Sequence, residues 1–254
     1  MKRTFNYAIT GVVVTTLLAF SFNDDLAKKI TPNNALTPKE RREGFKLLFD
    51  GKTLSNFRNY KKQTIGKDWI IDDEAIMLNA KELKPGQWQA DGGDLITKEK
   101  YENYELKIDF KVSHGANSGV IYNVQELDST QYVWQTGPEM QILDNDVHPD
   151  GKIDKHRTGD LYDLIRSSKE TTKAVGEWNH IVLRQKNGFV EQFLNGTKVV
   201  SVQIGGALWN KLVAGSKFKN MPFFGKFKEG HIALQDHGFK VWFRNIKIKM
   251  LDKG

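Results

Sequence analysis

The chain has 254 residues, of which 39% are hydrophobic and 27% charged, so it is long enough for one large domain with a substantial core. Its formal net charge is +7, but basic and acidic residues are interleaved, which favours a solvated surface over a nucleic-acid-binding patch. It has no cysteine, and this excludes disulfides, a thiolate nucleophile and a cysteine-based zinc site.

The start of the chain has the features of an export signal. Lys2 and Arg3 precede a mostly apolar stretch at residues 7–22, whose length suits a signal-peptide core and is short for a membrane span. We therefore expect a signal peptide at 1–23, a linker at 24–36 and a single domain at 37–254. The domain would be exported, periplasmic or extracellular, with no membrane span after leader cleavage; an uncleaved anchor is the alternative.

A short helix should open the domain. Thr37 can cap it, Pro38 suits the first helical position, and Glu40 completes a capping box. Gly44 should end this helix, and beyond it the sequence shows no pattern typical of a long helix.

The rest of the domain has the pattern of strands and turns. Residues 69–78 predict a hairpin, residues 104–112 alternate without a fault, and Asn195-Gly196 predicts a two-residue type I′ turn. Further strands are expected at 45–49, 118–124, 138–145, 181–184, 189–194, 199–202, 231–237 and 241–248. About a dozen short strands separated by turns predict an all-β fold, an antiparallel β-sandwich.

The stretch at residues 138–145 carries the main indication of a site. On a strand Met140 and Ile142 point to one face, and Glu139 and Gln141 stand together with Leu143 on the other. Asp144 and His148 follow just beyond the strand end. Such a group of side chains is a plausible active site, although a solvated sheet face that ends in a turn explains the same pattern.

The spacing Glu139-x-Gln141-x-x-Asp144 is similar to the acidic strand motif of sandwich glucanases. Those enzymes need two carboxylates about 5 Å apart for retaining hydrolysis, whereas Gln141 is an amide. An ordinary endo-glucanase is therefore the weaker interpretation. The strands at 231–237 and 241–248 are expected to form the last hairpin, and its Gln235 and His237 can join Glu139 and Gln141 only if their face of the sheet is the concave, ligand-binding one.

A series of short motifs runs through the domain in a fixed order. They lie at residues 48–54, 93–98, 117–120, 138–145, 148–150, 159–162, 177–179, 194–196, 216–218, 230–238 and 243–246. In this order they resemble the 3-keto-disaccharide hydrolase domain family, over about residues 44–250. The resemblance implies a concanavalin A-like jelly-roll β-sandwich of two curved antiparallel sheets. It also implies an exported enzyme that cleaves glycosides already oxidised to a ketone at sugar carbon 3.

The chemistry of such a substrate indicates which groups the site needs. A ketone at carbon 3 acidifies the proton on carbon 2, and its removal gives an enolate that expels the group on carbon 1; water addition completes a net hydrolysis. This requires a general base, a cationic group at the enolate oxygen and an acid at the leaving oxygen. A divalent metal ion could hold the ketone as a Lewis acid, and no organic cofactor is expected.

These requirements assign roles to the candidate residues. The candidate catalytic residues are Glu139 as base or ligand, Tyr162 as acid, His148 and His237. The candidate metal ligands are Glu139, Asp144 and His148. The candidate substrate-binding residues are Lys98 for an enolate, Trp88 for a ring face, and Asn117, Gln141 and Gln235.

Each candidate also has an ordinary structural explanation, such as an ion pair, a capped turn or packing. The second functional class is accordingly a non-catalytic carbohydrate-binding module, because the same sandwich often only binds sugar. A carbohydrate is the expected partner under both interpretations, with no nucleic acid, and the oligomeric state is left open. Trp178 and Trp242 are expected in the core.

Overall fold

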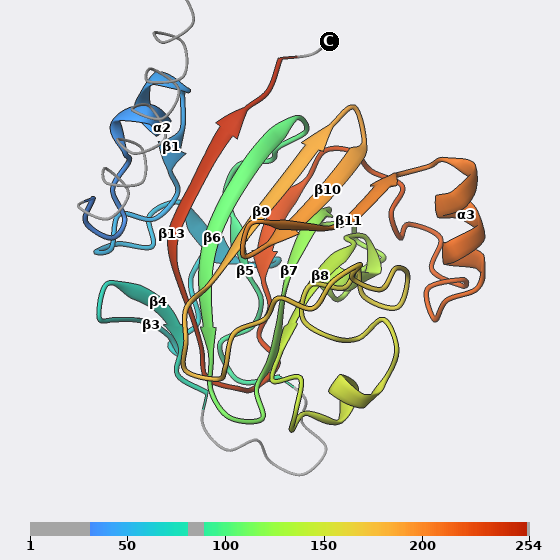
Figure 1. Cartoon of the computed structure of the whole chain (residues 1–254), viewed down its shortest axis with the longest axis horizontal. Helices are drawn as coiled ribbons and strands as arrows, with labels where there is room; N and C mark the ends of the chain where they lie inside the picture. The colour runs from blue at the N-terminus through green and yellow to red at the C-terminus, as the bar shows by residue number, and fades with distance from the viewer. Residues whose placement is uncertain (1–30, 81–88, 253–254) are drawn as a thin grey trace, which may run out of the picture.

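The computed structural model describes residues 31–80 and 89–252, and the predicted signal peptide and Trp88 lie outside this part (Figure 1). Its helices are short: α2 (Pro38–Arg42), α3 (Ala207–Ala214) and the 3-10 helices η1 (Val133–Gln135) and η2 (Pro149–Lys152). None of the described helices is long and apolar enough to cross a membrane.

Most of the described chain forms two antiparallel sheets. The strands are β1 (Lys46–Leu47), β2 (Phe57–Asn59), β3 (Trp69–Asp72), β4 (Ala75–Leu78), β5 (Leu95–Thr97), β6 (Tyr104–Val112), β7 (Asn117–Val124), β8 (Glu139–Leu143), β9 (Asn179–Lys186), β10 (Phe189–Leu194), β11 (Thr197–Gln203), β12 (His231–Leu234) and β13 (Val241–Met250). The larger sheet has the order β11-β10-β9-β6-β13-β4-β3, with β1 paired to β13. The smaller sheet has the order β2-β5-β12-β7-β8.

The sheets pack face to face around one main core, to which both contribute alternate side chains. In β6, Leu106 and Phe110 are fully buried, whereas Lys107 and Asp109 point outward and are partly exposed. In β8, Met140 and Ile142 enter the same core. The all-β jelly-roll sandwich expected from the sequence is confirmed, as is the short helix near its start.

The segment before β1 is held on the outer face of the larger sheet. Thr37 and Glu40 form the predicted capping box. The Glu40 carboxylate accepts from the Lys247 ammonium at 2.8 Å, and hydrogen bonds of this kind lower its pKa to about 2, against the effect of burial. Asn34 is buried and exchanges backbone-to-side-chain hydrogen bonds with Asn245, so the described end of the predicted linker packs on the domain.

The structure confirms two of the hairpins that the sequence predicts. Asn195 and Gly196 connect β10 to β11 with φ values of 49° and 83°, as a type I′ turn requires. The hairpin at residues 69–78 is formed by β3 and β4.

Four predictions about elements and packing need correction. The strand expected at 45–49 shortens to β1, and α3 was not expected. The strands β12 and β13 pair in different sheets, so they are not a hairpin. Trp178 and Trp242 are only partly buried, and they lie against the Lys111 ammonium at 5.0 and 4.5 Å instead of in the core.

Candidate active site

The site lies on the outer face of the smaller sheet. In the β7–β8 pairing, Gly119 lies opposite Gln141 and Ile121 opposite Glu139. The Gln235 backbone N–H, just after β12, donates to the Gly119 carbonyl at 3.0 Å. Because Met140 and Ile142 fill the core, strand alternation turns the polar side chains of β8 away from it.

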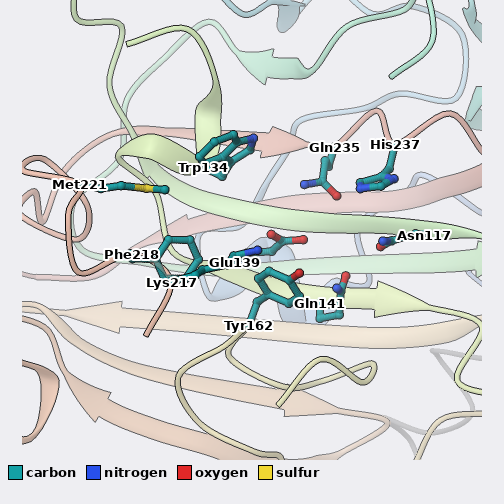
Figure 2. A pocket seen from close by; sticks show the side chains of 10 residues that line it. All are labelled: Asn117, Trp134, Glu139, Gln141, Tyr162, Lys217, Phe218, Met221, Gln235 and His237. Atoms are coloured by element: carbon teal, nitrogen blue, oxygen red, sulfur yellow. The ribbon is translucent and has the colours of Figure 1, made fainter. Parts of the chain in front are cut away.

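Polar and apolar side chains together surround a cavity of about 290 Å³ on this face (Figure 2). They come from strands of the smaller sheet and from segments that cover it. The lining residues are Asn117, Trp134, Glu139, Gln141, Tyr162, Lys217, Phe218, Met221, Gln235 and His237.

Glu139 is the central acid of the cavity. Its side chain is buried, with 5% of the residue exposed, and Gly119 provides the space for it. A Cβ at position 119 would lie 2.7 Å from the Glu139 carboxyl carbon, so the site needs glycine there. Burial raises the pKa of Glu139 to about 8; Lys217 opposes this shift, and the nearby carboxylates of Asp94 and Asp150 add to it.

Tyr162 and Lys217 stand beside Glu139. The Tyr162 hydroxyl donates to the Asp150 carboxylate at 3.1 Å, and the Lys217 ammonium lies 3.9 Å from the centre of the Tyr162 ring. Burial and the neighbouring carboxylates raise the pKa of Tyr162 well above its usual value. Much of the Lys217 side chain is exposed, yet loss of hydration around its ammonium lowers its pKa.

Asp163 fixes the backbone that carries Lys217. Its carboxylate accepts from the Lys217 backbone N–H at 2.8 Å and lies 3.1 Å from Nε2 of His156. The His156 ring in turn packs on the Tyr162 ring, with the centroids 4.2 Å apart. The two side chains beside Glu139 are therefore held by one connected group of residues.

Three amide side chains from β7, β8 and the end of β12 lie at one side of Glu139. Asn117, Gln141 and Gln235 are all buried. Within the described part of the chain, Oδ1 of Asn117 and Oε1 of Gln235 have no hydrogen-bond partner. Buried acceptors are almost always paired in native proteins, so these two oxygens are placed to receive hydroxyls from a ligand.

The two candidate histidines occupy different positions. His237 lines the cavity, and burial lowers its pKa, so its ring is neutral near pH 7. The His148 ring lies behind it, 6.4 Å from the His237 ring centre, and its Nδ1 accepts from the Asp150 backbone N–H. His148 thus supports His237 and caps η2.

The predicted metal ligands Glu139, Asp144 and His148 are not brought together. Glu139 and Asp144 are five residues apart along a strand, a distance of about 17 Å. The Asp144 carboxylate accepts backbone N–H groups of its own turn and of Gly115. Among the described residues, no group of three or more His, Asp or Glu side chains is placed to hold a metal ion, so we assign no step to one.

Lys98, expected at the enolate, is exposed beyond the end of β5 and does not line the cavity. The lysine that lines the cavity is Lys217, which lies in one of the family-like motifs but was not among the predicted site residues. Trp134, Phe218 and Met221 were also missed, because no spacing in the sequence links these segments to β8.

A cavity that joins a buried acid, amides and aromatic rings on a sandwich face has the features of a candidate active site. A family model described as the 3-keto-alpha-glucoside-1,2-lyase-like domain matches residues 44–249, and the chain belongs to this family. The resemblance found in the motifs is thereby confirmed, and the protein is a hydrolase of the glycosidase type.

Individual relatives agree with this assignment. The chain is 36% identical over 231 residues to a 3-keto-disaccharide hydrolase of Bacteroides thetaiotaomicron, covering 83% of this chain and 79% of that one. A crystal structure of a candidate glycosyl hydrolase from Parabacteroides distasonis has a TM-score of 0.78 and 33% identity, covering 87% and 100%. A second candidate glycosyl hydrolase from that organism has a TM-score of 0.58 and 25% identity, covering 82% and 99%.

Proposed function

We propose that the cavity cleaves glycosides whose sugar ring carries a ketone at carbon 3, including 3-keto-disaccharides. The observation that carries this proposal is the pairing of a buried acid with an amide on β8. Gln141 stands at the middle position of the glucanase-like motif, and the carboxylate of Asp144 at its last position is held by backbone N–H groups of its own turn, so β8 does not place two carboxylates side by side. An elimination needs only one base at this position.

Glu139 is the proposed base for the carbon-2 proton. The electron pair of the C2–H bond forms the enolate of the ketone, and its collapse breaks the bond from carbon 1 to the leaving oxygen. Water then adds to carbon 1 and gives up a proton that restores the acid which protonated the leaving oxygen, and the proton held by Glu139 returns to carbon 2. The raised pKa of about 8 makes the ionised carboxylate a stronger base than an ordinary glutamate.

Donors stand on both sides of this carboxylate. The side-chain amides of Asn117 and Gln235 can donate to the enolate oxygen as charge develops on it. On the other side, Tyr162 stays protonated because its pKa is raised, and it can protonate the leaving oxygen. The Lys217 ammonium over its ring stabilises negative charge at that oxygen.

We further propose that the enzyme works outside the cytoplasm. The support is the charged and apolar pattern of residues 1–23. A 3-keto sugar would then be processed in the periplasm or outside the cell.

The test compares methyl 3-keto-glucoside with methyl glucoside, each with and without a chelator. We expect cleavage of the ketone alone, and a slower reaction when carbon 2 carries deuterium, because the C2–H bond breaks before carbon 1 loses its substituent. Equal cleavage of both glucosides, or no isotope effect at carbon 2 in single-turnover measurements, would contradict the proposal. Binding of both glucosides without cleavage would instead support the carbohydrate-binding module.

A further inference from the structure

The register of β7 and β8 gives the cavity two ends of different chemistry. Toward the end of β8, Gln141 lies opposite Gly119, and Asn117 lies two residues further along, opposite Leu143. Toward its start, Glu139 lies opposite Ile121, which belongs to a small apolar cluster against which Trp134 packs. The amides and Trp134 therefore lie on opposite sides of Glu139, as Figure 2 shows.

Trp134, Phe218 and Met221 form what we call the aromatic end of the cavity (Figure 2). Trp134 is stacked on Tyr132, with the ring centres 5.2 Å apart and the planes 8° from parallel. Phe218 is stacked on Phe224 at 3.8 Å, also nearly parallel. Both faces of this end are thus held in place before any ligand binds.

A backbone hydrogen bond joins the two segments that provide these rings. The Gly225 N–H donates to the Thr136 carbonyl at 2.8 Å, which connects the segment after α3 to the end of η1. The aromatic end is consequently a built wall with a fixed position relative to Glu139. Preorganised walls of this kind bind a flat group at low entropic cost.

We propose that the aromatic end binds the leaving group of the glycoside and that it prefers an aromatic ring there to a second sugar. The proposal rests on the function proposed above, since it needs the oxidised sugar at the amide end. A second sugar would bring hydroxyls against Phe218 and Met221, and hydroxyls buried without partners are unfavourable. A phenyl ring has no such groups and stacks well on indole.

Removal of the indole tests the proposal. Trp134→Ala should lower kcat/KM for phenyl 3-keto-glucoside on the order of tenfold, which corresponds to the loss of one stacked ring. The loss on methyl 3-keto-glucoside, which has no ring to stack, should be several times smaller. Trp178→Ala, a tryptophan on the outer face of the larger sheet, is the matched control and should leave both rates unchanged.

A second variant makes the aromatic end more polar and leaves no large void where a side chain has been removed. Met221→Gln keeps the length of the side chain and adds an amide that can pair with hydroxyls. It should shift the ratio of kcat/KM values about fivefold away from phenyl 3-keto-glucoside and toward a 3-keto-disaccharide. This ratio is independent of any common loss of stability or expression.

The outcomes separate this inference from the proposed function. Equal losses on methyl and phenyl substrates in Trp134→Ala, with no change of ratio in Met221→Gln, would overturn the aromatic subsite while cleavage itself stands. A larger loss on the disaccharide than on the phenyl substrate would show that the leaving group is a sugar. If no 3-keto-glucoside is cleaved, the proposed function fails. Calorimetric binding of the phenyl and methyl compounds to Glu139→Gln, with and without Trp134→Ala, then decides whether Trp134 contacts a ring.

Discussion

The outer faces of the two sheets are built by the same strand alternation, yet their polar side chains differ in what they contact. On the larger sheet, charges on neighbouring strands pair with one another. Arg184 lies 2.8 Å from Glu105 and 3.4 Å from Glu191, and Asp109 accepts from Asn245 at 2.7 Å. On the smaller sheet, the polar groups face a cavity.

The cover over each face explains the difference. On the larger sheet, the partly or largely buried carboxylates of Glu105 and Asp109 each have a protein partner, which offsets the loss of water. The smaller sheet is covered by the segments around η1 and after α3, and two of its cavity acceptors, Oδ1 of Asn117 and Oε1 of Gln235, are buried without a protein partner among the described residues. Polar groups kept in that condition indicate a function, since their removal would favour folding.

The largest expected difference between the two outer faces comes from one buried acid on each of them, Glu139 on the smaller sheet and Glu105 on the larger. Glu139→Gln should lower the rate on methyl 3-keto-glucoside on the order of 100- to 10,000-fold, because the amide cannot take a proton. Glu105→Gln, which changes a paired acid on the other face in the same way, should leave the rate unchanged. A normal rate for folded Glu139→Gln would show that β8 is only a scaffold.

The same substitution has a defined effect on stability. The folded-state pKa of Glu139 is about 8, above the unfolded value near 4.5, so the folded protein keeps a proton that the unfolded chain has released. Stability from this group is full below about pH 4.5 and is lost as the pH rises toward 8. Glu139→Gln should therefore melt higher than wild type at pH 8 and similarly at pH 4.5 in calorimetry.

Gly119→Ala tests whether the position of Glu139 matters as much as its charge. The added methyl group would meet the Glu139 carboxylate and displace it, and we expect a loss of activity on the order of 10- to 100-fold. In a Glu139→Gln background the same change should add little, because residues that act as a unit are not additive. An equal extra loss in that background would mean that Gly119 acts through folding alone.

Local pattern predicted the parts of the site that depend on one strand. Alternation in residues 138–145 was enough to place Glu139 and Gln141 on one face. The same rule places Trp242 outward, between the buried Val241 and Phe243, and it outweighs the general preference of tryptophan for burial. Asp144 was misassigned because an aspartate after a strand pairs with its own turn more readily than with a distant ligand.

The remaining parts of the site depend on contacts between distant segments. Lys217 and Phe218 follow α3, and Trp134 lies in η1, so their arrival at β8 requires long-range packing that no local period encodes. Lys98 has the expected chemistry, but its strand ends before it reaches the cavity. Chemistry and spacing therefore predict the acid and the amides that line the cavity, whereas the lysine and the aromatic rings that line it follow only from the fold.

The pH dependence of the rate tests the roles proposed for Glu139 and Lys217. kcat/KM should rise about tenfold per pH unit below about pH 8, because Glu139 must lose its proton to act as a base. At higher pH it should fall as Lys217, whose pKa is lowered, loses its charge. Lys217→Arg should move only the alkaline fall upward, since arginine does not titrate in this range. A flat profile between pH 6 and 8 would exclude Glu139 as the base.

The smallest expected effects come from removing one polar side chain on each face. The two substitutions should change KM and thermal stability in opposite patterns. Gln235→Met keeps the side-chain length and removes an acceptor that has no partner in the described structure, so KM should rise about tenfold while the melting temperature stays equal or rises. Asp109→Ala removes a carboxylate that bonds His180 and Asn245, so it should lower stability by about 1–2 kcal/mol and leave KM unchanged.

Thermal melting and steady-state kinetics on the same two preparations give both readouts. If Gln235→Met destabilises the fold as much as Asp109→Ala does, its amide is structural, and the polar groups of the smaller sheet are paired in solution like those of the larger one. If only KM changes, the unpaired acceptors of the smaller sheet are reserved for the hydroxyls of the substrate.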